Sequence, residues 1–271
     1  MRAIVFIHRG GPQMASYRYR AQMPADYLKT SVNGGPCEIA VFSKPCEEDL
    51  ALAKDLKAKG SKIVVDFCDD HFKHKSLGMI YREMAEIADH IVCPTDVMAS
   101  RIPVTRPMAV IPDPAETQAR IPHADGDSLL WFGHSSNLKA IEPHAKLPNL
   151  RIVSGPKSFD GVTLWSPQNI KRAMAEANIC LFPTVNGDEY KSNNRFINAV
   201  NAGLFPVCNQ HPSYAEFKGL AWLGGIQEGL RWCSQESEYL DDLVLEMQEI
   251  IKNKYSIDVV GEQWKSLLES I

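Results

Sequence analysis

The chain has 271 residues, of which 45% are hydrophobic and 23% charged, so it can fold as one large or two modest globular domains with a real core. Its formal net charge of −4 argues against a protein built chiefly to coat nucleic acid, although a local basic patch is compatible with it. The seven cysteines are scattered without a CxxC spacing, which disfavours a zinc ribbon or a thioredoxin-type motif and favours free thiols in a reducing compartment.

The first half of the chain alternates short apolar runs with helix-like segments. The opening run, residues 3–7, is too short for the core of a signal peptide or for a membrane span, so we interpret it as a strand and expect a cytoplasmic protein. Further strands are expected at 38–42, 62–67, 90–93 and 108–111. Helices are expected at 47–59 and 77–88.

The same alternation restarts after a polar, Pro- and Gly-containing segment at 113–127, which we interpret as a linker. Strands are expected in the second half at 128–132, 150–153, 162–165, 179–182, 205–208 and 220–223. Helices are expected at 168–177, 193–202 and 236–253, and Trp264 is expected to anchor a terminal helix. This pattern predicts an α/β protein of two Rossmann-like domains, residues 1–115 and 126–271, with parallel sheets facing a central cleft.

The most informative stretch is the polar loop and helix that follow the expected strand at 179–182. Ser192 is a good N-cap, and Asn194, Asn198 and Asn201 share one face of the helix, apart from its apolar stripe. Backbone N–H groups at the start of this helix, with Lys191 and Arg195 nearby, suit a phosphate, and Asn198 suits ribose hydroxyls. The alternative is an ordinary capped helix with a solvated polar face.

Two further groups of residues follow expected strands of the first half. Gly10 and Gly11 either let the backbone approach a ligand or only form a tight turn, and Arg18 and Arg20 reach either anionic ligand groups or solvent. Four polar residues lie at the end of the strand expected at 62–67: Asp66, Asp69, Asp70 and His71. They could contact an acceptor or transfer protons, because they lie at the carboxyl end of a parallel strand. Alternatively, the aspartates could cap a helix. Clustered carboxylates can also bind Mg²⁺, which we disfavour here.

Several of these segments together resemble the donor-binding region of retaining GT-B glycosyltransferases, of the kind called glycosyl transferases group 1. The segments are 179–183, Lys191-Ser-Asn-Asn-Arg195, 199–203, 206–207 and 212–216, with weaker matches at 16–20, 24–25, 65–71 and 110–114. The resemblance covers about residues 1–220. It implies the GT-B fold, a C-terminal helix that crosses back to the first domain, and no metal or cofactor besides the nucleotide-sugar donor, such as a UDP- or GDP-sugar.

The resemblance also implies roles for individual residues. Lys191 and Arg195 would stabilise the leaving diphosphate, with Asp69 and His71 as further catalytic candidates. The donor would contact Gly10, Gly11, Gly133, His134, Lys139, Ser192, Asn193, Asn194 and Asn198. The acceptor would lie near Arg18, Arg20, Asp66 and Asp70.

Three positions depart from the family pattern. Asn198 and Tyr190 stand where such transferases often carry glutamates, and His134 stands where an arginine is common. The resemblance implies a glycosyltransferase that acts with retention on an unknown acceptor, and these departures leave two alternatives open. One is a noncatalytic nucleotide-sugar-binding protein. The other is sugar transfer onto modified bases of nucleic acid. The net negative charge of the chain disfavours nucleic acid as a partner.

Overall fold

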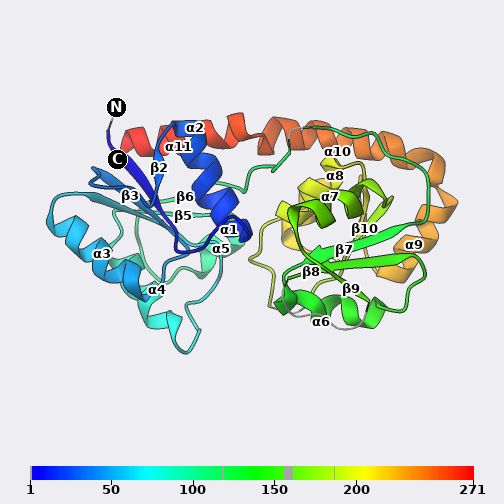
Figure 1. The fold of residues 1–271 in the computed structure, drawn as a ribbon, viewed down its shortest axis with the longest axis horizontal. Coiled ribbons are helices and arrows are strands. Elements are labelled where there is room, and N and C mark those ends of the chain that lie inside the picture. The colour runs from blue at the N-terminus through cyan, green and yellow to red at the C-terminus, as the bar shows by residue number, and fades with distance from the viewer. Residues whose placement is uncertain (1, 118, 156–160, 186) are drawn as a thin grey trace. The chain divides into compact units, whose positions relative to one another are not determined.

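The computed structural model describes residues 2–117, 119–155, 161–185 and 187–271 (Figure 1). The chain divides into two compact units. The first contains the chain up to Pro114, the short segment Tyr190–Ser192 and the C-terminal segment Tyr255–Ile271. The second contains Ala115–Glu189 and Asn193–Lys254.

The first unit is built on a six-stranded parallel sheet with the order β2-β1-β3-β4-β5-β6. Its strands are β1 Ile4–Ile7, β2 Ser31–Val32, β3 Ile39–Ser43, β4 Lys62–Asp66, β5 His90–Cys93 and β6 Met108–Val110. In the register of the central pair, Val41 lies opposite Val64 and Phe42 opposite Val65. These central strands are almost continuously apolar because helices cover both faces of the sheet.

A long helical run, Ala15–Leu28, follows β1 and consists of α1 Ala15–Tyr17, a π-helical stretch Arg18–Gln22 and α2 Met23–Leu28. The other helices of this unit are α3 Glu47–Ala58, α4 Leu77–Ile87, α5 Asp96–Arg101 and α11 Ile257–Ser270. The C-terminal helix α11 lies beside α2 (Figure 1). Its Trp264 is fully buried and packs edge-on against Phe6, with ring centroids 5.4 Å apart, which confirms the anchoring role predicted for this side chain.

The second unit repeats the plan with a parallel sheet of order β12-β11-β10-β7-β8-β9. Its strands are β7 Leu129–Gly133, β8 Leu150–Ser154, β9 Val162–Leu164, β10 Ile179–Phe182, β11 Phe205–Cys208 and β12 Trp222–Leu223. The main helices are α6 Leu138–Ile141, α7 Pro167–Ala175, α8 Asn194–Asn201, α9 Ile226–Gln235 and α10 Leu240–Tyr255. Short 3₁₀ turns lie at Ser135–Asn137, Glu142–His144, Pro212–Phe217 and Ser237–Tyr239. The two separate parallel sheets confirm the predicted α/β fold class.

The segment predicted as a linker is largely an ordered strap on the second unit. Side-chain amides hold its backbone carbonyls: Asn201 donates to Thr117 O at 2.9 Å, Gln248 to Ile121 O at 2.8 Å, and Asn178 to Ala124 O at 2.7 Å. Because an extended segment outside a sheet has no ladder partners, these amides satisfy carbonyl groups that would otherwise need water. The boundary between the units lies at Pro114 and Ala115, at the start of this strap.

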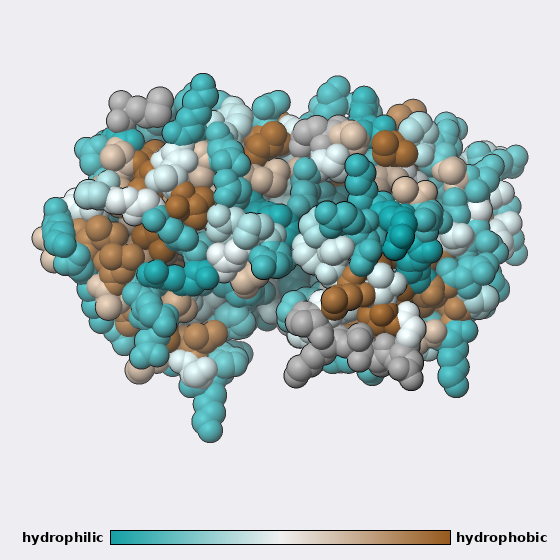
Figure 2. Space-filling model, viewed as in Figure 1, coloured by the Kyte–Doolittle hydropathy of each residue, from teal (hydrophilic) through white to brown (hydrophobic). Residues whose placement is uncertain are grey.

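The large exposed hydrophobic side chains of the described residues lie on several separate elements. On the face shown in Figure 2, hydrophilic side chains separate the hydrophobic ones. Three of the most exposed hydrophobic residues, Met79, Leu164 and Leu245, lie on or beside α4, β9 and α10 respectively. None of the helices in the described ranges combines the length and the apolar character needed to cross a membrane.

Candidate functional site

Polar and charged side chains collect at the carboxyl edge of the first sheet. The loops after β1, β3, β4 and β5 carry His8, Lys44, Asp69 and Thr95 respectively. Open parallel sheets bind their ligands at this edge because all the strand-to-helix loops meet there. The sequence predicted contributions from Gly10, Gly11 and Asp69. His8, directly after the predicted strand 3–7, and Lys44, two residues after the predicted strand 38–42, were not singled out.

The glycine loop after β1 is tightly bound to its surroundings. The buried His8 ring accepts a hydrogen bond at Nδ1 from Gly10 N at 2.8 Å, and its Nε2 lies 3.0 Å from Ser16 Oγ. Burial, with a further contribution from Lys44, lowers the pKa of His8 to about 4 against the opposing effect of Asp49. The ring is therefore neutral at physiological pH.

Position 10 needs a glycine because a side chain would not fit there, and not because its backbone angles exclude other residues. A Cβ at this position would lie 2.8 Å from His8 Cε1 and would also collide with the Met14 sulfur. At Gly11 the nearest contact of such a Cβ would be the flexible end of Gln13, at 3.1 Å. Both glycines lie where the sequence placed them, and only Gly10 has a demonstrable packing reason to be glycine.

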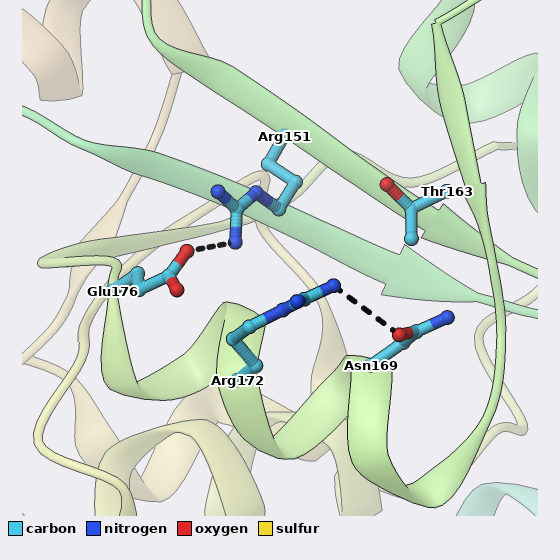
Figure 3. Close-up of a pocket in the computed structure, with 5 residues that line it drawn as sticks. All are labelled: Arg151, Thr163, Asn169, Arg172 and Glu176. Carbon is cyan, nitrogen blue, oxygen red and sulfur yellow. Dashed lines mark hydrogen bonds and ion pairs between the residues drawn. The ribbon is translucent and has the colours of Figure 1, made fainter.

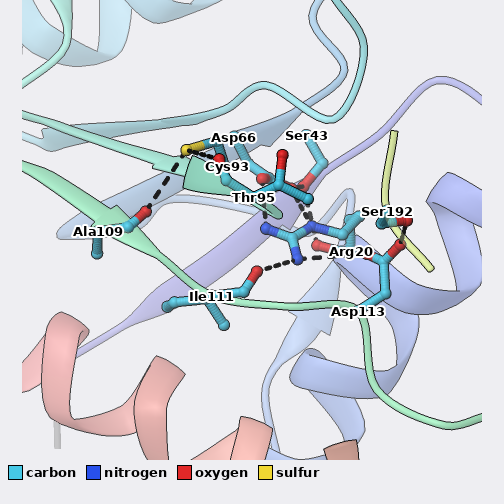
Figure 4. Close-up of polar contacts among 9 residues, drawn as sticks. All are labelled: Arg20, Ser43, Asp66, Cys93, Thr95, Ala109, Ile111, Asp113 and Ser192. Atoms are coloured by element: carbon cyan, nitrogen blue, oxygen red, sulfur yellow. Dashed lines mark hydrogen bonds and ion pairs between the residues drawn. The ribbon is translucent and has the colours of Figure 1, made fainter. Parts of the chain in front are cut away.

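Arg20 lies in the core of the first unit and not at a surface that a ligand could reach (Figure 4). Its guanidinium binds both carboxylate oxygens of Asp66, at 2.6 and 2.9 Å, and donates to Ile111 O at 2.6 Å. Burial alone would lower the pKa of Arg20, but the Asp66 carboxylate more than offsets this and raises it. Arg20 and Asp66, which were predicted on the acceptor side, are thus buried and paired with each other, an arrangement that gives them a structural role in the first unit. Arg18 is half-buried and donates to Pro12 O at 2.7 Å.

The same network holds the short segment Tyr190–Ser192, which packs within the first unit. Ser192 Oγ donates to Asp113 Oδ2 at 2.5 Å (Figure 4), and Thr95 Oγ1 donates to Tyr190 O at 2.9 Å. Ser192 was predicted to cap the following helix. Instead Asn193 occupies the N-cap position of α8, without a side-chain capping bond, because the Ser192 hydroxyl is committed to Asp113.

The residues after β4 form two ion pairs. Lys44 Nζ lies 2.6 Å from Asp69 Oδ2, and Arg101 Nη1 lies 3.0 Å from Asp70 Oδ2. Burial raises the pKa of Asp69, but Lys44, His71 and Lys191 outweigh it, and the resulting pKa lies below the usual value. Asp69 is thus a carboxylate at neutral pH, while burial lowers the pKa of His71 and keeps that ring neutral. No group of three or more His, Cys, Asp or Glu suited to a metal ion occurs in the described ranges.

Lys44 adopts a left-handed backbone conformation with φ of 53°. Such a conformation is unfavourable for a residue with a long side chain and is often found at functional sites. Together with its ion pair to Asp69, it makes Lys44 a candidate site residue that no sequence motif indicated.

An arginine side chain at the carboxyl edge of the second sheet has no carboxylate partner within the described part of the chain. Arg195, on α8, donates to Phe132 O at 2.9 Å, and its guanidinium carbon lies 5.8 Å from the Trp131 ring centroid and 5.9 Å from that of Phe182. A Cβ at Gly133 would lie 3.0 Å from Arg195 Nη1, so the glycine makes room for the guanidinium. Among the described residues Arg195 forms no ion pair, so most of its donors stay available to an anion.

The other predicted donor contacts divide into two groups. His134 Nδ1 accepts from Ser136 N at 3.2 Å and so caps a 3₁₀ turn, while Lys139 is exposed on α6. Asn198 is buried: its Oδ1 accepts from Glu116 N at 2.8 Å and its Nδ2 donates to Asn194 O at 2.8 Å. The polar stripe of α8 therefore holds the strap, and a ribose contact at Asn198 would require its amide to leave Glu116.

The sequence matches no protein-family model and no curated protein sequence. Solved structures do match the fold over nearly the whole chain. HepE of Anabaena, in complex with UDP, matches with a TM-score of 0.71 at 10% identity and covers 100% of both chains. An α-glucosyltransferase in complex with UDP-glucose and DNA containing an abasic site matches with a TM-score of 0.65 at 11% identity, over 98% of each chain. An α1,3-fucosyltransferase matches with a TM-score of 0.56 at 9% identity, over 98% of this chain and 90% of that chain.

The fold is the GT-B fold. This GT-B chain also has a polar cavity of about 300 Å³ on its second unit, which the sequence did not predict (Figure 3). Arg151 forms an ion pair with Glu176 there, and Arg172 Nη2 lies 3.4 Å from Asn169 Oδ1. Its side chains come from β8, β9 and α7, so the cavity does not include the glycine loop or Arg195.

Proposed function

We propose that the chain is a glycosyltransferase that moves a sugar from a nucleoside-diphosphate sugar, with a UDP-sugar as the first candidate. Three of the similar GT-B structures contain UDP or UDP-glucose. The observation that carries the proposal is Arg195, a half-buried cation without an ion-pair partner among the described residues, at the carboxyl edge of a parallel sheet.

The leaving nucleoside diphosphate gains negative charge in the transition state, so catalysis depends on fixed positive groups. Arg195 and the N–H groups at the start of α8 would hold this charge, because a helix N-terminus carries a partial positive charge. We assign Lys191, four residues before Arg195 in the chain, as a second cation for the diphosphate. Because these groups already provide positive charge, we propose that transfer needs no metal ion.

The acceptor hydroxyl must lose a proton during transfer. His71 is the best-suited acceptor of that proton on the first unit because its lowered pKa keeps the ring neutral near pH 7. Asp69, kept as a carboxylate by Lys44, would stabilise a protonated His71 electrostatically. We propose transfer with retention of configuration, in keeping with the family that the donor segments resemble.

A second acceptor class is favoured by two of the similar structures. Both are α-glucosyltransferases in complex with DNA, one with an abasic site and UDP-glucose, the other with an A:G mismatch and UDP. Sugar transfer onto nucleic acid is therefore the specific alternative to a small-molecule acceptor for this chain.

The direct test is to incubate the protein with a panel of UDP- and GDP-sugars, with EDTA present, and to measure release of the nucleoside diphosphate in a coupled assay. Duplex DNA is added in a second arm. We expect release from at least one donor, and expect Lys191→Ala to slow it at least 10-fold. A protein that binds a nucleotide sugar tightly but releases no diphosphate in either arm would instead be a binding module, as the replacement of the usual glutamates by Asn198 and Tyr190 would allow. A protein that binds no member of the panel contradicts the proposal.

A further inference from the structure

The hydrogen bonds of His8 determine which of its ring nitrogens carries the proton. A backbone N–H can only donate, so Nδ1, which accepts from Gly10 N at 2.8 Å, is unprotonated. The neutral ring therefore carries its hydrogen on Nε2 and donates it to Ser16 Oγ at 3.0 Å. This direction excludes His8 as a base for the Ser16 hydroxyl.

Residues from neighbouring segments hold the His8 ring in place. The amide of Asn33 bonds both backbone groups of His8, accepting from its N–H and donating to its carbonyl, each at 3.0 Å. Tyr17 packs edge-on against the imidazole, with ring centroids 5.6 Å apart. Gly10 lies so close that the ring leaves no room for a Cβ there. His8 thus holds Gly10 on one side and Ser16 on the other in one fixed arrangement.

The Ser16 hydroxyl is left with its own hydrogen to donate. The Ser16 oxygen accepts a hydrogen bond from His8, so the hydroxyl can still donate its own hydrogen to a ligand. Among the described residues, no group accepts this hydroxyl hydrogen. Ser16 is half-buried at the start of the helical run Ala15–Leu28. Of the cationic side chains on neighbouring segments, Arg9 is paired with Asp49 and Lys44 with Asp69, and Arg18 donates to Pro12 O. A phosphate oxygen is the strong acceptor that the proposed nucleotide-sugar or phosphodiester substrate would offer to the free hydrogen of Ser16.

We propose that the Ser16 hydroxyl donates a hydrogen bond to a phosphate oxygen of the substrate and that His8 is the positioning residue that presents it. The proposal rests on the proposed function, because the phosphate belongs either to the nucleotide-sugar donor or to a phosphodiester acceptor. Ser16 makes the contact, and His8 acts through Ser16 and the glycine loop.

Two substitutions separate the two nitrogens of His8. Asparagine places an acceptor near the position of Nδ1, so His8→Asn retains the bond to Gly10 but loses the donor to Ser16. Glutamine places an N–H near the position of Nε2, so His8→Gln retains the donor to Ser16. Ser100→Ala is the matched control, because Ser100 is a helical serine of the same unit whose hydroxyl only donates to Val97 O.

The experiment is calorimetric titration of each variant with UDP and, separately, with a short DNA duplex. We expect Ser16→Ala to weaken binding of one of these ligands about 10- to 150-fold, since a hydrogen bond to a charged oxygen is lost. His8→Asn should weaken the same ligand by a smaller factor, and His8→Gln and Ser100→Ala should bind like the wild type. In the Ser16→Ala background, His8→Asn should cause no further loss, because its effect acts through Ser16.

The outcomes distinguish the source of the phosphate. A loss confined to UDP identifies the donor diphosphate, and a loss confined to the duplex identifies a phosphodiester. If the wild type binds UDP or the duplex and Ser16→Ala binds both equally well, the proposed contact is overturned. If His8→Asn is as damaging with Ser16→Ala as without it, the positioning role is overturned. A wild type that binds neither ligand refutes the proposed function itself.

Discussion

Arg20 and Asp66 show how a charged pair can be structural although its sequence context suggests a site. Both side chains are almost fully removed from solvent, and the guanidinium binds both oxygens of the carboxylate.

Removing one partner leaves an uncompensated buried charge, which typically costs about 3–5 kcal/mol. We therefore predict that Arg20→Met lowers the free energy of unfolding by about that amount, measured by urea denaturation. Lys54→Ala, which breaks an exposed ion pair with Glu83, is the control and should cost less than about 1 kcal/mol. Equal effects of the two substitutions would show that Arg20 is not part of a buried network.

The sequence could not reveal the burial of Arg20, because Asp66 lies 46 and Asp113 lies 93 residues from Arg20 along the chain.

At the level of elements, the strands were well predicted because each is a short, nearly unbroken apolar run. The predicted strands at 90–93, 179–182 and 205–208 coincide with β5, β10 and β11. The two-residue edge strand β2 was missed because it is too short to show a pattern. The helix α8 was located correctly. The hydrogen bonds of its asparagines to the strap were not predicted, since they join residues some 80 positions apart in the chain.

These asparagine contacts can be tested by stability. Asn198→Ala removes the acceptor for Glu116 N and the donor to Asn194 O, so we predict a loss of about 1–3 kcal/mol in the free energy of unfolding. Asn253→Ala, on the exposed side of the neighbouring helix α10, should cause no loss, and thermal or urea unfolding measures both. If Asn198→Ala is as stable as the wild type but binds UDP more weakly, the side chain serves the nucleotide and not the strap.

On the scale of the whole molecule, periodicity and turn signals were sufficient to predict two parallel α/β sheets, and the fold comparisons confirm the GT-B architecture. Part of the candidate site was also accessible from sequence, because ligand-binding loops follow strands at predictable places. Arg195 and Gly133 were identified in this way, and the structure places them in contact. Lys44, His8 and Ser16 were not predicted, because their significance comes from a backbone conformation, a tautomer and a hydrogen bond that only the folded chain displays.

The central claim, that Arg195 binds the diphosphate of a nucleotide sugar, is tested most directly by calorimetric titration of the wild type and of Arg195→Ala with UDP. We predict that the wild type binds UDP and that the variant binds it about 10- to 150-fold more weakly, since a charge-assisted contact of about 1.5–3 kcal/mol is lost. Arg172→Ala, which removes an exposed arginine of the same unit at the separate cavity, should leave UDP binding unchanged. Thermal unfolding of both variants checks that the fold is retained. If the wild type binds neither UDP nor GDP, or if a folded Arg195→Ala variant binds UDP as tightly as the wild type, this account of the site is contradicted.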